Sequence, residues 1–234
     1  GLGGGRRGCG GQVVGWTTEE AGSCGVLDAF IDHGFGTMGT ADVYSAWGEG
    51  HIGGEAESVL GKWFAARPGM RDKVKLFTKV GSDMGGPGEK GLSEAWITKA
   101  VDRSLDRMGI ETIDLYFSHW PDADVTHAET LGAYDKLIKA GKIRAIGASN
   151  YDASLLSAAL ETAKAEGLPA YQVAQPEYNL YDRDAYEGPI QKLCTENDIG
   201  VVTYFSLAAG FLTGKYRSNA DLEGRQRAGM VEKY

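Results

Sequence analysis

Three side chains capable of acid–base chemistry, Tyr44, Lys79 and His119, each stand just beyond an apolar stretch that is predicted to be a buried strand. An ammonium group stabilises a nearby phenolate, so a tyrosine beside a lysine becomes a better proton donor. A histidine can donate a hydrogen bond that orients and polarises an oxygen atom. One tyrosine at a strand end is usually a packing residue, but polar groups at the ends of three strands indicate a shared site.

Strand and helix patterns alternate along the chain and would position these residues. We assign helices where apolar residues recur near the helical period, and strands where short apolar runs lie between turn residues. The predicted strands cover residues 1–5, 35–40, 74–78, 113–117, 143–148, 171–174 and 200–204. The predicted helices run from a capping box at 17–20 to residue 32, and over residues 55–66, 94–108, 131–140, 155–165 and 186–197.

The helix at residues 94–108 carries recognisable end signals. Ser93 can cap its first turn, Glu94 lies beside the positive end of the helix dipole, and Gly109 can end the helix in the left-handed conformation. Alternating strands and helices favour a parallel sheet that helices cover, and residues 113–117 are apolar enough to be buried on both faces. Periodicity alone leaves two architectures open, a doubly wound open sheet and a (β/α)8 barrel.

Composition and charge argue against several classes of function. The 234 residues carry a net charge of −8, which disfavours binding to nucleic acid or to an anionic membrane. No apolar run approaches the roughly 20 residues of a membrane span, and no signal peptide is expected. The three cysteines are widely spaced, as is typical of a reducing compartment, so we expect a cytoplasmic protein. The four histidines lack close ligand spacing, and no metal site is predicted.

A glycine-rich start offers a second nucleotide-binding hypothesis. Gly3, Gly5 and Gly8 match the spacing G-x-G-x-x-G of the dinucleotide fingerprint. That fingerprint needs a helix directly after the glycines, whereas the first predicted helix starts only near Thr18. A Rossmann site is therefore not predicted.

Four segments resemble the aldo-keto reductases, barrel enzymes that move a hydride from a nicotinamide to a carbonyl. The segments are Gly-Thr-Ala-Asp-Val-Tyr at residues 39–44, Phe-Thr-Lys-Val at 77–80, Tyr-Phe-Ser-His-Trp-Pro-Asp at 116–122 and Gly-Lys-Ile-Arg-Ala-Ile-Gly-Ala-Ser-Asn at 141–150. By this resemblance Tyr44, Lys79 and His119 match the family's catalytic Tyr, Lys and His. The position of the family's catalytic Asp holds Gly39. We expect the nearby Asp42 to be a solvated loop carboxylate, the common case for aspartate.

The resemblance selects the barrel from the two architectures. It implies a single aldo-keto reductase-like domain over residues 1–234. This domain would be an incomplete (β/α)8 TIM barrel of about seven strand–helix units, in which the last strand and the final helices are missing. A closed barrel has no free edges, so we expect that an incomplete one can self-associate through its open edges.

The resemblance also implies a site for NADPH. Ser149, Asn150 and Gln175 match the polar residues that hold the nicotinamide carboxamide, and Tyr204 matches the aromatic residue that stacks on the nicotinamide ring. The loop at residues 205–217 is similar to the segment that straps the pyrophosphate. Its expected cofactor contacts are Phe205, Ser206, Leu207, Gly210 and Lys215. Small residues there let backbone N–H groups approach phosphate oxygens, and a lysine adds charge.

The predicted function is NADPH-dependent reduction of an aldehyde or ketone, a small-molecule carbonyl substrate, to an alcohol. The alternative is a catalytically impaired nucleotide-binding regulatory module of the same fold, similar to the potassium-channel β subunits, and Gly39 favours it. Trp16, Trp47 and Trp120 are predicted to lie in loops at the same mouth. They would be either packing residues or pocket walls suited to flat apolar carbonyl compounds.

Overall fold

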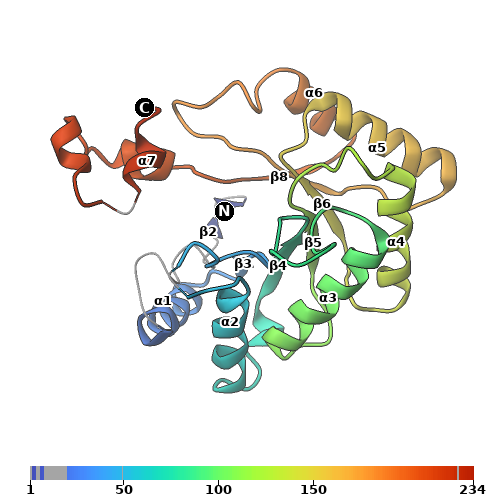
Figure 1. The fold of residues 1–234 in the computed structure, drawn as a ribbon, viewed down its shortest axis with the longest axis horizontal. Helices are drawn as coiled ribbons and strands as arrows, with labels where there is room; N and C mark the ends of the chain where they lie inside the picture. Colours follow the sequence, from blue (N-terminus) through green and yellow to red (C-terminus); the bar gives the residue numbers. More distant parts are fainter. Residues whose placement is uncertain (1, 4–5, 8–19, 49, 226) are drawn as a thin grey trace.

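Parallel strands form the central sheet, and each is hydrogen-bonded to the next strand along the chain. The computed structural model describes residues 2–3, 6–7, 20–48, 50–225 and 227–234 (Figure 1). Within these residues the parallel strands are β3 (Thr37–Gly39), β4 (Lys75–Val80), β5 (Leu115–Ser118), β6 (Ile146–Ser149), β7 (Val173–Gln175) and β8 (Gly200–Thr203). In this register Gly39 lies opposite Phe77, and Lys79 lies opposite Phe117.

Helices connect successive strands and cover the outer side of the curled sheet (Figure 1). They are α1 (Glu20–Asp32), α2 (Glu55–Ala65), α3 (Glu94–Met108), α4 (His127–Lys139), α5 (Ala153–Glu166) and α6 (Pro189–Glu196). This alternation confirms the predicted incomplete (β/α)8 barrel. None of the helices in the described ranges combines the length and apolarity that a membrane span requires.

A C-terminal arm lies beyond β8, apart from the arc of helices (Figure 1). It contains two short 3₁₀ helices, η2 (Ala208–Thr213) and η3 (Asn219–Leu222), followed by α7 (Ala228–Val231). The earlier η1 (Arg71–Lys73) instead precedes β4. The arm therefore adds short turns rather than another strand–helix unit.

The predicted first strand at residues 1–5 differs from a barrel strand. Leu2–Gly3 (β1) pairs antiparallel with both Arg6–Arg7 (β2) and β8. The described residues thus hold six parallel strands and a short hairpin, instead of about seven strand–helix units. β2 approaches β3 at the opposite end of the sheet, which shows how far the sheet curls. Thr17 of the predicted capping box lies outside the described residues, as do Gly5 and Gly8.

The helix ends follow the capping signals in the sequence. The Ser93 hydroxyl accepts a hydrogen bond from the Trp96 amide at 3.3 Å, and Gly109 ends α3 with a φ of 61°. Both predicted ends of this helix are confirmed. Thr126 and Asp152 cap α4 and α5 in the same way, by accepting from amides in the first turn.

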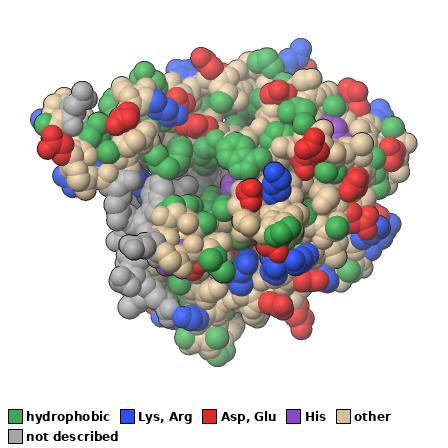
Figure 2. All heavy atoms as spheres, viewed as in Figure 1, with side chains coloured by type: hydrophobic (Ala, Val, Ile, Leu, Met, Phe, Trp, Pro, Cys, Tyr) green, Lys and Arg blue, Asp and Glu red, His purple; other side chains and the backbone are tan. Residues whose placement is uncertain are grey.

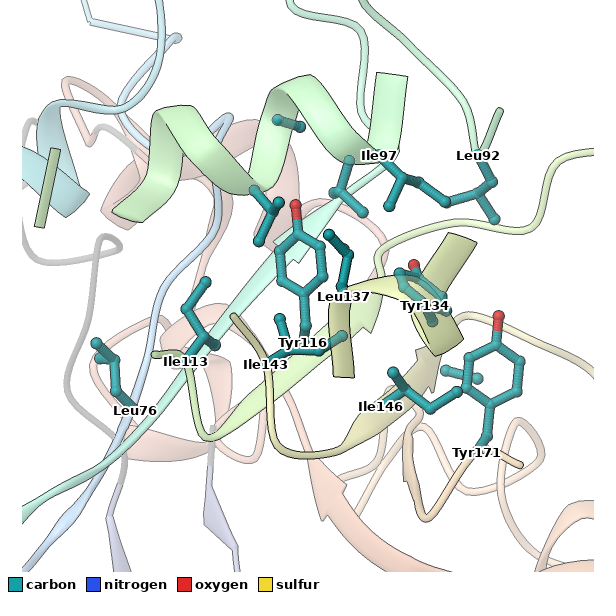
Figure 3. Packing of buried hydrophobic residues seen from close by; sticks show 14 of the residues in the cluster. Leu76, Leu92, Ile97, Ile113, Tyr116, Tyr134, Leu137, Ile143, Ile146 and Tyr171 are labelled. Carbon is teal, nitrogen blue, oxygen red and sulfur yellow. The ribbon is translucent and has the colours of Figure 1, made fainter. Parts of the chain in front are cut away.

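Large side chains fill the layer between the strands and the helices (Figure 3). Tyr116 of β5 meets Tyr134 of α4 edge to face with ring centroids 6.0 Å apart, and Tyr134 meets Tyr171 at 6.4 Å. Alternate residues of a strand point to opposite faces, so Phe117 lies on the other face of the sheet. Gly147 gives that ring space, because a Cβ at residue 147 would lie 2.4 Å from it.

Candidate active site

The predicted site residues gather at the carboxyl ends of the parallel strands. Lys79 lies near the end of β4, and Ser149 and Gln175 are the last residues of β6 and β7. His119 and Tyr204 directly follow β5 and β8. In barrel enzymes this end of the sheet carries the chemistry.

Lys79 and Tyr44 are in direct contact. The buried Lys79 ammonium donates to the Tyr44 hydroxyl oxygen at 3.0 Å and to the carbonyl oxygen of Thr40 at 2.8 Å. Its nitrogen also lies 4.5 Å from the centroid of the Tyr44 ring. Because the phenol oxygen accepts from the ammonium, its own proton is directed elsewhere. The pair therefore has the geometry of a proton donor with an electrostatic activator.

His119 completes a group of three with these residues. Its ring stands edge-on to that of Tyr44 at 5.9 Å between centroids, and its Nδ1 lies 3.0 Å from the Ser82 hydroxyl. The side chain is only 9% exposed. Burial, and then the nearby Lys79 ammonium, lower the pKa of His119 to about 2. The imidazole is therefore neutral at physiological pH and can donate one hydrogen bond without carrying charge.

A second polar group joins the ends of β6, β7 and β8. The Asn150 side-chain nitrogen donates to the His119 carbonyl oxygen at 2.9 Å and to the Ser149 hydroxyl oxygen at 3.2 Å, while its Oδ1 accepts from the Tyr204 hydroxyl at 2.7 Å. The Ser149 hydroxyl donates to the Gln175 carbonyl oxygen at 3.0 Å. Asn150 adopts a φ of 61°, a strained conformation that asparagine tolerates better than most residues. The predicted carboxamide and stacking residues therefore lie together.

The ring of Tyr204 is set in a fixed environment beside this group. Burial, and then the Glu177 carboxylate, raise the pKa of Tyr204 to about 12, so its hydroxyl stays protonated and donates to Asn150. The ring lies 5.3 Å from that of Phe205 in an edge-to-face arrangement. Its aromatic face thus stands at the same strand ends as the three catalytic candidates.

The loop after Tyr204 has an unusual backbone. Phe205, Ala208, Ala209 and Gly210 all have positive φ values, from 50° to 105°. Such backbone conformations gather N–H groups into concave turns that suit anions. A Cβ at Gly210 would lie 3.2 Å from the end of the exposed Lys215 side chain, so glycine leaves room for that cation.

Two backbone amides of this loop are available for a ligand. Within the described parts of the chain, the N–H groups of Ser206 and Leu207 have no hydrogen-bond partner. In the view of Figure 2, hydrophobic side chains gather where the C-terminal arm meets the body of the protein. The strap predicted from the sequence therefore has free donors, a nearby cation and an apolar flank.

Aromatic residues flank the three catalytic candidates. The Trp47 ring lies 5.8 Å from that of Tyr44, and the Trp120 ring stacks on His119 at 5.8 Å. The two are 41% and 49% exposed, as expected of walls at an open mouth rather than of core residues. Trp16 lies outside the described residues.

Comparison with known proteins shows which family this chain belongs to. Residues 1–233 match the family described as "Aldo/keto reductase family". The chain belongs to this family. The resemblance inferred from the four sequence segments is thereby confirmed.

Three relatives align along most of this chain. It is 32% identical over 223 residues to "Uncharacterized oxidoreductase YrpG" of Bacillus subtilis, which covers 93% of this chain and 67% of the relative. It is 35% identical over 227 residues to aldo-keto reductase yakc (NADP(+)) of Schizosaccharomyces pombe, covering 94% and 63%. It is 32% identical over 195 residues to a "Probable voltage-gated potassium channel subunit beta" of Arabidopsis thaliana, covering 83% and 57%. The chain thus spans 57% to 67% of the length of these three relatives.

The residues present fit the nicotinamide cofactor that this family implies. The side-chain amide of Gln175 is nearly buried at the strand ends and has no hydrogen-bond partner among the described residues, so it can bind a polar ligand group. Ser149 and Asn150 hold each other in place and would exchange one of their present bonds for a ligand. The amides of Ser206 and Leu207 and the Lys215 ammonium would supply donors and a positive charge to a diphosphate.

Sequence analysis matched Gly39 with the position of the family's catalytic Asp. Among the described residues, no atom would lie within 4 Å of a Cβ at this position, so their packing does not demand a glycine. Lys79 is held without a carboxylate at residue 39, because the Thr40 carbonyl is part of the backbone. The two printed contacts that place Lys79 therefore do not depend on a side chain at residue 39.

The prediction that Asp42 is a solvated loop carboxylate is wrong. Asp42 is only 1% exposed. In the described parts of the chain, neither of its carboxyl oxygens accepts a hydrogen bond from another side chain. Burial, and then the nearby Glu57 carboxylate, raise the pKa of Asp42 well above its ordinary value. Glu57 itself is paired with Arg107 at 2.9 Å and accepts from the Thr78 hydroxyl at 2.6 Å. Asp42 therefore lies in a buried polar cluster between β4 and the helices α2 and α3.

Sequence reasoning missed two contributors to the site. Ser82 touches His119 from the loop after β4, and Thr40 binds Lys79 through its carbonyl oxygen. Neither has a residue-type signal, because a serine in a loop and a backbone carbonyl occur in every protein.

Proposed function

We propose that this chain forms the core of an NADPH-dependent aldo-keto reductase that reduces an aldehyde or ketone to an alcohol. One observation carries the proposal: Lys79 lies 3.0 Å from the Tyr44 hydroxyl, beside a neutral buried His119. When bound, the nicotinamide supplies the hydride that adds to the carbonyl carbon. The preference for NADPH over NADH follows the habit of the family, as does a cytoplasmic location.

Each of the three residues has a distinct task in this proposal. Tyr44 donates its proton to the substrate oxygen as negative charge develops there. Lys79 stabilises the phenolate that is left, because a positive charge at 3.0 Å favours the charged form of the tyrosine. His119 donates a hydrogen bond to the same oxygen and so orients the carbonyl. Trp47 and Trp120 would flank the substrate and exclude water from it.

A nucleotide-binding regulatory module is the second candidate function. Gly39 favours it, because the site then lacks one charge of the catalytic set. The similarity to proteins named as potassium channel β subunits gives it a precedent within the family. The intact contact between Lys79 and Tyr44 favours the reductase.

Measuring nucleotide binding and turnover separately distinguishes these functions. Quenching of protein fluorescence by NADPH reports binding, and loss of nicotinamide absorbance with a panel of aromatic and aliphatic aldehydes reports turnover. Binding with turnover supports the reductase, and binding without turnover supports the regulatory module. Absence of quenching, in a protein whose Tyr204→Ala variant behaves identically, would reject the cofactor site. Sedimentation of the same sample tests the predicted self-association through open barrel edges.

A further inference from the structure

We propose that Ser82 is a positioning residue that donates its hydroxyl proton to Nδ1 of His119 and thereby holds the proton of the imidazole on Nε2. This inference rests on the proposed function for its consequence, but the position of the proton can be measured without turnover. It starts from a distance of 3.0 Å between the Ser82 hydroxyl and Nδ1.

The two nitrogens of the His119 ring face different surroundings. Nδ1 faces Ser82, whereas Nε2 has no hydrogen-bond partner among the described residues. A neutral imidazole carries one N–H, and the hydrogen bond made by one nitrogen decides which of them holds it. If Nδ1 accepts from the hydroxyl, the proton must lie on Nε2, the nitrogen left for a ligand.

Backbone hydrogen bonds and two ring contacts hold His119 in its position. The backbone of His119 is held on both sides, since its amide donates to the Val80 carbonyl oxygen at 2.8 Å and its carbonyl accepts from Asn150 at 2.9 Å. The ring stacks on Trp120 and stands edge-on to Tyr44. With the ring in this orientation, the tautomer decides whether Nε2 donates or accepts.

Serine suits this task better than most residues that could stand there. A hydroxyl can donate or accept, so it permits the Nε2–H tautomer, whereas a carboxylate or a carbonyl would force the proton onto Nδ1. The neighbouring charge of Lys79 disfavours a second proton on the ring. With one proton on the ring, only the Nε2–H tautomer can donate to a carbonyl oxygen in the site, whereas the other tautomer presents a lone pair to it.

The backbone directs Ser82 toward the histidine. Gly81, which precedes it, has a φ of 120°, a conformation that residues with a side chain rarely adopt. A Cβ at Gly81 would also lie 3.2 Å from the Leu92 side chain. The chain therefore turns sharply after β4 at a glycine, and the turn places the Ser82 hydroxyl on Nδ1.

Nitrogen NMR of the ¹⁵N-histidine-labelled protein at neutral pH tests the inference directly. Long-range ¹H–¹⁵N correlations distinguish the Nε2–H tautomer from the Nδ1–H tautomer, and the spectrum of His119→Gln assigns the signal among the four histidines. We expect the Nε2–H tautomer in the unaltered protein and in Ser82→Thr, which keeps the hydroxyl. We expect a mixture of tautomers in Ser82→Ala. Ser157→Ala, which removes a hydroxyl on α5 bonded to Glu161, should leave the signal unchanged.

Turnover supplies the second readout. Ser82→Ala should lower kcat about tenfold, the effect expected from losing one oriented hydrogen bond, while the Kd for NADPH stays the same. Ser82→Thr should restore most of the rate. The Nδ1–H tautomer in the unaltered protein, or an unchanged tautomer in Ser82→Ala, would overturn the inference whether or not the protein turns over. A correct tautomer in a protein without turnover would support it and count against the proposed reductase instead.

Discussion

Acidification should destabilise the protein through His119 by an amount that its burial allows us to calculate. The folded-state pKa is lowered to about 2, while an unfolded histidine has a pKa of about 6.5. A lowered folded pKa means that the stabilising contribution is present above pH 6.5 and is lost as the pH falls toward about 2. Between pH 6.5 and pH 5, an interval of about 1.5 pH units, the unfolded state binds a proton at this histidine and the folded state does not. At about 1.4 kcal/mol per unit, folding loses about 2 kcal/mol between pH 7.5 and pH 5.

Comparing variants isolates this contribution from that of the carboxylates. The free energy of unfolding by urea is measured from pH 7.5 to pH 5 for the unaltered protein, for His119→Gln and for His33→Gln, which alters an exposed histidine directly after α1. We expect the curve of His119→Gln to be flatter by about 2 kcal/mol at pH 5, and that of His33→Gln to parallel the unaltered protein. Parallel curves for all three proteins would refute the neutral, buried imidazole, and with it the role of His119 as an uncharged hydrogen-bond donor.

Three further predictions concern the same end of the sheet. Tyr44→Phe should lower kcat by about 10²–10⁴-fold with an unchanged Kd for NADPH, since it removes the proton donor and leaves the fold intact; an unaltered kcat would mean that Tyr44 only packs. Gly39→Asp should raise kcat about tenfold over the isosteric but neutral Gly39→Asn, because a carboxylate there favours the ammonium form of Lys79; equal rates would show that another group already supplies this charge. Asp42→Asn should raise stability at pH 7 by about 1–3 kcal/mol, because the raised pKa means that Asp42 contributes stability below about pH 4 and loses it as the pH rises. In urea unfolding the gain should vanish at pH 3, and a loss of stability at pH 7 would indicate that Asp42 has a charged partner.

Local signals predicted the helices more accurately than the pairing of the first strand. Ser93 and Gly109 fix the ends of α3 through contacts within a few residues, so the sequence contains the whole cause of those ends. The pairing of Leu2–Gly3 with β8 joins segments about 200 residues apart in the chain, and no local pattern encodes its antiparallel direction. The parallel strands between them were predicted within a few residues, because buried runs alternate with amphipathic helices throughout that region.

In the candidate site, too, some features were predicted from the sequence and others are seen only in the structure. Tyr44, Lys79 and His119 were predicted because each lies at or shortly beyond the end of a strand, and the barrel brings strand ends together whatever the details of the loops. The partner of His119 and the burial of Asp42 depend on how the loops after β3 and β4 fold over the strand ends. Those loops are irregular, so the contact of Ser82 and the environment of Asp42 appear only in three dimensions.

The effect of having glycine at residue 39 can be inferred from the contacts that hold Lys79 in place. The two contacts that place Lys79 are a backbone carbonyl and the phenol that it activates, and neither depends on the side chain at residue 39. Among the described residues, no atom lies within 4 Å of the place that a Cβ at residue 39 would take, so a side chain has room there. Asp42, the nearest acidic residue along the chain, lies with Glu57 and tends to hold a proton, so it offers Lys79 little negative charge. Glycine at residue 39 should therefore leave the site assembled and able to bind its ligands, and change mainly the rate of the proton transfer that Lys79 assists.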